Sequence, residues 1–236
     1  MTQQSNLFTS LLEIYTDRWD MILVSIGQHI YISLLSIIIA LFISIPLGIY
    51  LSRNKKLADS IIGVAGVFQT IPSIALFGFL MPFVGIGVKP TVIALVLYAL
   101  APIIRNVYTG IVEVNQSVVD AGRGMGMTSW QILWIIEIPL ALPVIMAGIR
   151  TATVWTIGIT TIAAFIGAGG LGEIIFRGVA LMRPELVLAG AIPAAFLAIL
   201  TEFLLKKLER KVTPFNQKSH TKKVKQNDSN KKDKVA

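Results

Sequence analysis

Cysteine and histidine are almost missing from this sequence. None of its 236 residues is a cysteine, and its two histidines are His29 and His220. The lack of cysteine excludes disulfides, thiolate metal ligands and cysteine nucleophiles, and two histidines cannot form a zinc motif of the HExxH type. A Walker A phosphate loop is also absent. We therefore expect no catalytic residue, no metal and no cofactor, and a protein that is not an enzyme.

Charged residues are scarce as well. They make up 14% of the chain, whereas soluble proteins carry about 25%. Apolar residues make up 54% of the chain, and the mean hydropathy is +0.73. Because a bilayer accepts helices whose backbone groups are all paired internally, this composition indicates an all-α membrane protein that has the lipid bilayer as its surroundings.

Five segments are long enough to cross a bilayer, which requires about 20 mostly apolar residues. They lie at about residues 29–51, 60–82, 90–107, 143–166 and 186–205. The third segment contains Pro102, which is expected to interrupt its helix. We expect a transmembrane domain over residues 21–210, preceded by an extracellular N-terminal segment at residues 1–20.

Basic residues are concentrated on one side of the predicted membrane domain. Residues 206–236 contain eleven Lys and Arg against three Asp and Glu, a surplus equal to the net charge of +8. Because cytoplasmic loops are enriched in Lys and Arg, we expect the N-terminus outside and the C-terminus in the cytoplasm. Residues 211–236 are predicted to be a disordered basic tail. The tail either anchors the chain at the membrane or contacts anionic lipid or RNA; we favour the anchor and no nucleic-acid partner.

Three polar residues, Gln69, Thr70 and Ser73, lie in the middle of the second predicted span. In a single helix they would fall on neighbouring faces. They are candidates to line a translocation pathway. The alternative is that they form hydrogen bonds between helices without touching a solute.

Arg150 is the one charge well inside a predicted span. A charge at the bilayer centre costs roughly 2.5–3.5 kcal/mol on insertion scales, so such residues are functional candidates. Arg150 follows Pro143 by seven residues, and its long side chain can reach the cytoplasmic interface from there. Arg150 is therefore a candidate for a structural role or for the pathway, with Glu202 as a possible partner.

The run GAGGLG at residues 167–172 has the glycine content of a phosphate loop. It lacks the GxxxxGK[ST] spacing of such loops, and it lies on the predicted outer side. We expect a tight external turn there.

The segment between the third and fourth spans is the most informative part of the chain. Residues 120–143 begin with a polar, glycine-rich half and end with Pro139 and Pro143, which are expected to stop or kink a helix. We predict one or two short helices outside the bilayer, with Asp120 in a first helical turn. Glycines and methionines there allow close contact with a soluble partner. The alternative is a helix lying flat on the membrane.

This segment resembles the cytoplasmic loop of the membrane subunits of ATP-binding cassette (ABC) importers. Their pattern is E-A-A, three residues, G, nine residues and I-x-L-P. This chain has Asp120-Ala121-Gly122, then Gly126, then Ile136-x-Ile138-Pro139 with the same spacing. The resemblance implies a MetI-like fold of about five transmembrane helices, with a coupling helix in a cytoplasmic segment at about residues 113–139. It also implies that Asp120, Ala121 and Gly126 shape the contact with the ATPase and that Pro139 closes the segment. Gly122 and Met127 are the other residues that the resemblance assigns to coupling.

Three further runs resemble the permeases for glycine betaine, carnitine and choline. They are residues 61–76, 139–151 and 166–172. The resemblance implies a bacterial plasma-membrane permease that forms the pathway of an ATP-driven osmoprotectant importer. Its implied partners are two cytoplasmic ATPases, a second permease that is identical or homologous, and an external solute-binding protein. Two alternatives remain: a permease of the same architecture for another small zwitterion or cation, such as an amino acid or ergothioneine, or an ATP-independent channel or secondary transporter.

Overall fold

The computed structural model describes residues 7–212, which are mostly helical and contain no strand. The elements are as follows: α1 (Leu7–Asp17), α2 (Trp19–Arg53), α3 (Lys55–Thr70), α4 (Ser73–Val84), α5 (Val88–Val112), α6 (Gln116–Gly124), α7 (Ser129–Ile132), the π-helical stretch η1 (Leu133–Glu137), α8 (Ile138–Ile162), the 3-10 turn η2 (Ala163–Ile166), α9 (Leu171–Ala180) and α10 (Pro184–Val212). The predicted basic tail, from residue 213 onward, lies outside the described residues.

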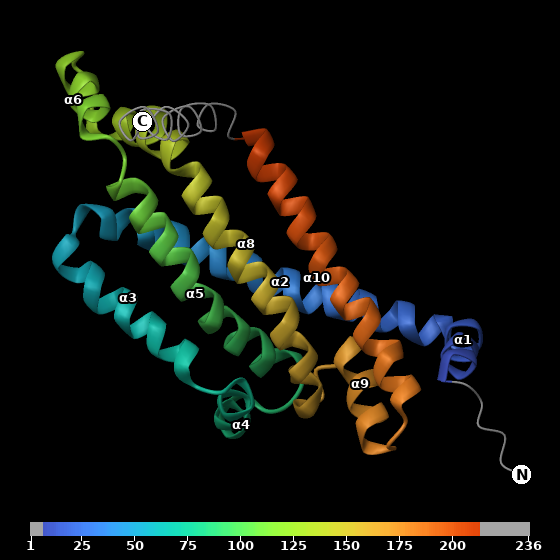
Figure 1. The fold of residues 1–236 in the computed structure, drawn as a ribbon. Coiled ribbons are helices and arrows are strands. Elements are labelled where there is room, and N and C mark those ends of the chain that lie inside the picture. The colour runs from blue at the N-terminus through green and yellow to red at the C-terminus, as the bar shows by residue number, and fades with distance from the viewer. Residues whose placement is uncertain (1–6, 213–236) are drawn as a thin grey trace, which may run out of the picture.

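Among the described residues, four helical stretches are long and apolar enough to cross a membrane singly. They are Trp19–Arg53, Val88–Val112, Ser129–Ile166 and Pro184–Lys211. A fifth crossing is possible if the bent pair α3 and α4 is counted as one span. The expected all-α fold with about five apolar segments is therefore confirmed. In Figure 1 the end of the bundle that carries α6 lies opposite the end that carries α1 and α9.

The second predicted span is not one helix. It breaks between α3 and α4, whose axes differ by 98°. Pro72 disfavours the helical conformation at the residue before it, and Ile71 is extended with φ −75° and ψ 128°. Gln69 and Thr70 therefore end α3, while Ser73 begins α4. The prediction that these three polar residues lie on neighbouring faces of one helix is wrong, because they belong to two helices.

Two hydrogen bonds connect this break to α5, and one of them explains why Pro102 does not interrupt α5. Proline lacks the N–H that would bond the carbonyl four residues earlier, which belongs to Tyr98. In this structure the Gln69 Nε2 donates to the Tyr98 carbonyl at 3.2 Å, and the Tyr98 hydroxyl donates to the Ile71 carbonyl at 2.5 Å. α5 continues through Pro102 to Val112, so the predicted interruption is wrong because a neighbouring helix pairs the freed carbonyl.

The core is centred on α5, which packs against α2, α3 and α8 (Figure 1). Small residues let the helices approach closely. A Cβ at Gly48 of α2 would lie 2.6 Å from the Val107 Cβ, and one at Gly148 of α8 would lie 2.4 Å from the Asn106 Cβ. The surrounding apolar core is built from buried residues of three helices: Ile37, Ala40, Val96, Ala99, Ile103, Val107, Ala141 and Ile145.

The run at residues 167–172 forms the predicted tight turn between η2 and α9. Gly167, Gly169 and Gly170 have φ of +74°, +80° and +78°, a region that L-residues with a Cβ rarely adopt. The Gln28 Oε1 accepts a hydrogen bond from the Gly170 N–H at 3.0 Å. Its neighbour His29 is buried, and its Nε2 donates to the Ile157 carbonyl at 3.0 Å. This end of α2 therefore holds both the turn and α8.

Candidate coupling site

The segment between α5 and α8 folds as two short helices, as the sequence predicts. Asn115 caps α6, since its Oδ1 accepts from the Ser117 N–H at 3.0 Å. This cap starts the helix at Gln116, so Asp120 is its fifth residue, and the prediction of Asp120 in the first turn is wrong. Asp120 instead accepts hydrogen bonds from Gln116 and Arg123, both at 3.1 Å.

Gly126 makes the turn that ends α6. Its φ is +79°. The Gly126 N–H donates to the Arg123 carbonyl at 2.9 Å, and the Met127 N–H donates to the Gly122 carbonyl at 3.1 Å. These two bonds form a Schellman cap, which requires a left-handed residue at this position. Thr128 then starts α7 with a capping box, in which its hydroxyl and the Gln131 side chain each accept a backbone N–H.

The coupling residues divide into an outward and an inward group. Asp120, Ala121 and Gly126 are exposed, so they are available to a partner. Gly122 is buried, and a Cβ there would lie 2.7 Å from the Ile136 Cδ1 and 3.3 Å from the Met127 Sδ. Gly122 therefore seats α6 on the chain that follows, and Met127 packs on the same inner side. Two large apolar side chains project beside the outward group: Met125 (74% exposed) and Trp130 (69% exposed).

Pro139 does not close the segment. The helical backbone runs from Ser129 through η1 into α8 without a break, past both Pro139 and Pro143. In η1 the Ile138 N–H bonds the Leu133 carbonyl five residues back, and Pro139 follows at the start of α8, where a missing N–H is tolerated. The expectation that these prolines stop the helix is therefore wrong, and a kink at either proline stays a prediction.

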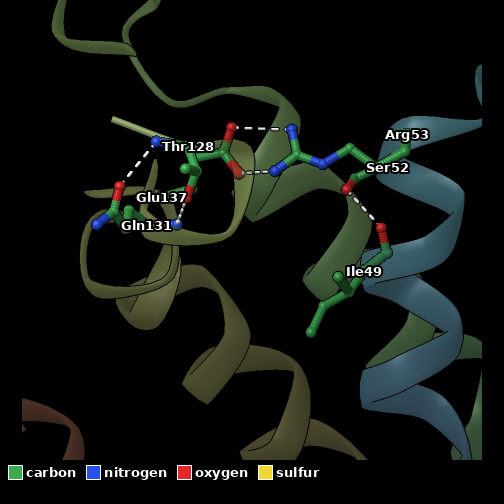
Figure 2. A network of polar contacts seen from close by, with 6 residues as sticks. All are labelled: Ile49, Ser52, Arg53, Thr128, Gln131 and Glu137. Atoms are coloured by element: carbon green, nitrogen blue, oxygen red, sulfur yellow. Dashed lines mark hydrogen bonds and ion pairs between the residues drawn. The ribbon is translucent and has the colours of Figure 1, made fainter. Parts of the chain in front are cut away.

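Arg53 of α2 joins this segment to the membrane helices. Its Nη1 donates to the Glu137 Oε1 at 3.0 Å, and its Nη2 donates to the other carboxylate oxygen. Figure 2 shows the guanidinium reaching from the end of α2 to Glu137, near the Thr128–Gln131 capping box. Neither Arg53 nor Glu137 was a candidate in the sequence analysis. The one available signal was a lone carboxylate within the apolar run LWIIEIPL.

A groove of about 810 Å³ lies between the last turns of α2 and the coupling segment. Its walls are mostly apolar: Ile45, Pro46, Ile49, Trp130, Leu133 and Trp134. Arg53 and Arg123 also line it. Within residues 7–212 there is no cluster of three His, Cys, Asp or Glu side chains that could hold a metal ion.

Arg150 lies in α8 and forms ion pairs with α10. Its Nη1 is 3.3 Å from the Glu202 Oε1 and 3.8 Å from the Glu209 Oε2. The expected partner Glu202 is therefore present, and Glu209 is an additional one. The Arg150 side chain is 24% exposed. This geometry supports a structural role, in which Arg150 neutralises the negative charge of two carboxylates on α10.

Replacing Arg150 with glutamine is expected to lower stability by about 1 kcal/mol, the upper end for partly exposed pairs, because Glu202 and Glu209 lose their cation. Thermal unfolding of the purified protein in detergent would show this as a lower midpoint. Adding Glu209→Gln to Arg150→Gln should recover part of the loss. A midpoint that is unchanged in Arg150→Gln would contradict the structural role.

Known proteins resemble this chain over most of its length. The family described as binding-protein-dependent transport system inner membrane component matches residues 40–214. The glycine betaine/carnitine/choline permease OpuCB of Bacillus subtilis is 47% identical over 188 residues, which cover 80% of this chain and 87% of the relative. The carnitine permease OpuCB of Listeria monocytogenes is 46% identical over 205 residues, 87% and 94% of the two chains. The osmoprotectant permease OsmW of Salmonella typhimurium is 45% identical over 192 residues, 79% and 89%.

Solved structures show the same fold. A chain of the MetNI methionine ABC transporter in an inward-facing form aligns with a TM-score of 0.76 and 23% identity, covering 84% of this chain and 98% of that one. A chain of an amino acid ABC transporter aligns with a TM-score of 0.68 and 20% identity, covering 89% and 100%. The expected MetI-like fold is thus confirmed. On the family match and these identities, the chain belongs to the binding-protein-dependent transport system inner membrane components, the membrane subunits of ABC importers.

Proposed function

We propose that this chain is the permease subunit that forms the translocation pathway of an ATP-driven importer for osmoprotectants such as glycine betaine, carnitine or choline. The observation that carries the proposal is the 47% identity to a permease of a glycine betaine/carnitine/choline system, together with the exposed coupling segment. ATP is hydrolysed by separate subunits, and this chain contributes movement rather than chemistry.

The coupling segment is the proposed contact with the ATPase. Asp120, Ala121 and Gly126 form its exposed polar and small surface, beside the apolar side chains of Met125 and Trp130. Such a projecting helix fits a groove on a soluble partner. When ATP closes the partner subunits, the segment moves and turns the pathway from outward-facing to inward-facing as a motion of packed helices.

The proposed complex contains two ATPases, a second permease that is identical or homologous, and an external solute-binding protein. We place the N-terminus outside a bacterial plasma membrane and the C-terminus in the cytoplasm. Figure 1 shows α6 and the C-terminal end of α10 at the same end of the bundle. That end carries Arg53, Arg123, Arg210 and Lys211, which supports a cytoplasmic location through the excess of basic residues.

The break between α3 and α4 is the proposed position where the chain meets the pathway. Thr70 is exposed there, and its hydroxyl donates to the Val67 carbonyl at 2.8 Å within its own helix. Ser73 is partly buried at the start of α4. Gln69 already uses its amide to hold α5, so its proposed contribution is to shape the break rather than to bind solute.

Uptake of labelled solute tests the proposal. Cells that lack other osmoprotectant transporters would express this chain with its ATPase and binding protein. We expect uptake of labelled glycine betaine that unlabelled choline or carnitine reduces by competition. Competition by an amino acid or ergothioneine alone would instead assign the same architecture to another solute. A control that omits the ATPase should show no uptake.

A further inference from the structure

Arg53 and Glu137 join two parts of the molecule that are 84 residues apart. Arg53 is the last residue of α2, and the single residue Asn54 separates it from α3. Glu137 is the last residue of η1, which connects the coupling segment to α8. The pair therefore links the corner between the first two membrane segments to the place where the coupling segment enters the membrane domain (Figure 2).

The link is favoured by its two-bond geometry and by the burial of Glu137, while Arg53 is 44% exposed. The Glu137 side chain is 6% exposed, and both its oxygens accept from one guanidinium. Arginine matches a carboxylate with two parallel hydrogen bonds, which also fixes the relative orientation of the two groups. A buried carboxylate that loses its partner is strongly unfavourable, so Glu137 and Arg53 are held together.

Little else holds α2 to the coupling segment. The groove of about 810 Å³ lies between their facing side chains, with Ile45 and Ile49 on one side and Trp130 and Trp134 on the other. In the part of the chain that the structure describes, no other hydrogen bond or ion pair joins α2 to residues 113–137. Apolar contact at Leu133 remains, but it does not fix an orientation. The ion pair is therefore the oriented connection between two surfaces that leave space between them.

The backbone beside Glu137 departs from a regular α-helix. η1 is a π-helical turn, a form that is rare and often found at functional positions. Pro139 has no N–H for the Ile135 carbonyl, so the helix lacks one hydrogen bond beside this turn. A push on α6 and α7 could be absorbed by this turn unless another contact carries it into the membrane helices.

We propose that Arg53 and Glu137 are positioning residues that carry the movement of the coupling segment to the cytoplasmic end of α2 and to the corner between α2 and α3. This inference rests on the proposed function. With the pair intact, the cytoplasmic end of α2 moves with the coupling segment when an ATPase moves that segment. With the pair broken, η1 bends, and ATP hydrolysis is no longer converted efficiently into solute movement.

The experiment uses the whole complex in proteoliposomes and measures solute uptake, ATP hydrolysis and the amount of ATPase that purifies with the permease. Glu137→Gln keeps the side-chain shape and removes the charge. We expect the number of solutes taken up per ATP to fall by about tenfold, which lies within the range measured for mutations that alter coupling. The reversed pair, Arg53→Glu with Glu137→Arg, should recover most of that ratio. Arg177→Gln, which breaks the exposed Arg177–Glu173 pair, is the control and should leave the ratio unchanged.

A covalent cross-link in place of the ion pair distinguishes an effect on coupling from an effect on folding. The chain contains no cysteine, so Arg53→Cys with Glu137→Cys can be joined selectively by a short bifunctional maleimide. The joined protein should take up more solute per ATP than the same protein before joining. Uptake and hydrolysis that fall in parallel with the amount of folded complex would overturn the proposal, as would a joined protein that gains nothing. Wild-type complex without ATP-dependent uptake would overturn the proposed function itself, and this inference with it.

Discussion

Replacing Gly126 with valine is expected to abolish solute uptake and docking of the ATPase, while the chain still inserts into the membrane. The expected loss comes from backbone strain and not from a steric clash. Gly126 has φ +79°, and a Cβ there would meet no described atom within 4 Å. A left-handed conformation costs an L-residue about 1–2 kcal/mol, and β-branched residues tolerate it worst. The Schellman cap would open, and α6 would no longer hold its angle to α7.

Gly63→Val is the control for this prediction, because Gly63 lies in α3, outside the coupling segment. Gly63 is also exposed and has no described atom within 4 Å of a built Cβ, but its φ lies outside the left-handed region. Uptake, copurification of the ATPase and membrane content should be measured for both variants. We expect Gly63→Val to retain most uptake. Normal uptake in Gly126→Val would remove the assignment of residues 120–126 as the coupling contact.

Gly148→Ala is expected to lower the free energy of unfolding strongly. A Cβ at this position would lie 2.4 Å from the Asn106 Cβ and 2.9 Å from the Pro102 carbonyl oxygen, so α5 and α8 would have to separate. Overpacking of this kind costs typically 1–3 kcal/mol, occasionally more. The added Cβ would also crowd the Asn106 side chain, whose Nδ2 donates to the Pro102 carbonyl at 2.7 Å within α5.

Gly158→Ala in the same helix gives the opposite expectation. A Cβ there would have no described atom within 4 Å, and alanine favours a helix by about 1 kcal/mol over glycine. Detergent-extracted protein should therefore unfold at a lower temperature in Gly148→Ala and at an equal or higher temperature in Gly158→Ala. Equal midpoints for the two variants would contradict the close crossing of α5 and α8.

Sequence reasoning recovered what depends on local composition. Long apolar segments predict the membrane helices, and the polar, glycine-rich run between the third and fourth segments predicts the short helices α6 and α7. Its errors arose where a distant partner decides the outcome. Pro102 leaves α5 intact because Gln69 pairs the freed carbonyl, and nothing near Pro102 in the sequence indicates that partner. The same applies to Arg53 and Glu137, whose pairing depends on how α2 and α8 pack.

The position of Asp120 shows a different limit. Gln116, Ser117 and Asp120 are all compatible with the start of a helix, but Asn115 provides the cap and so sets the start earlier. Helix boundaries depend on such single hydrogen bonds, whereas the existence of a helix depends on many residues. The 98° break at Ile71 and Pro72 is a similar case. Pro72 marks its position in the sequence, but the hydrogen bond that holds the bend comes from the Tyr98 hydroxyl in another helix.

The most direct test of the central claim is solute uptake into proteoliposomes that contain this permease with its ATPase, with the binding protein on the opposite side of the bilayer. ATP or a non-hydrolysable analogue would be supplied on the ATPase side. We predict uptake of glycine betaine, choline or carnitine with ATP, none with the analogue, and none when the ATPase is omitted. Uptake by the permease alone, unaffected by ATP, would contradict an ATP-driven importer and would favour a channel or secondary transporter.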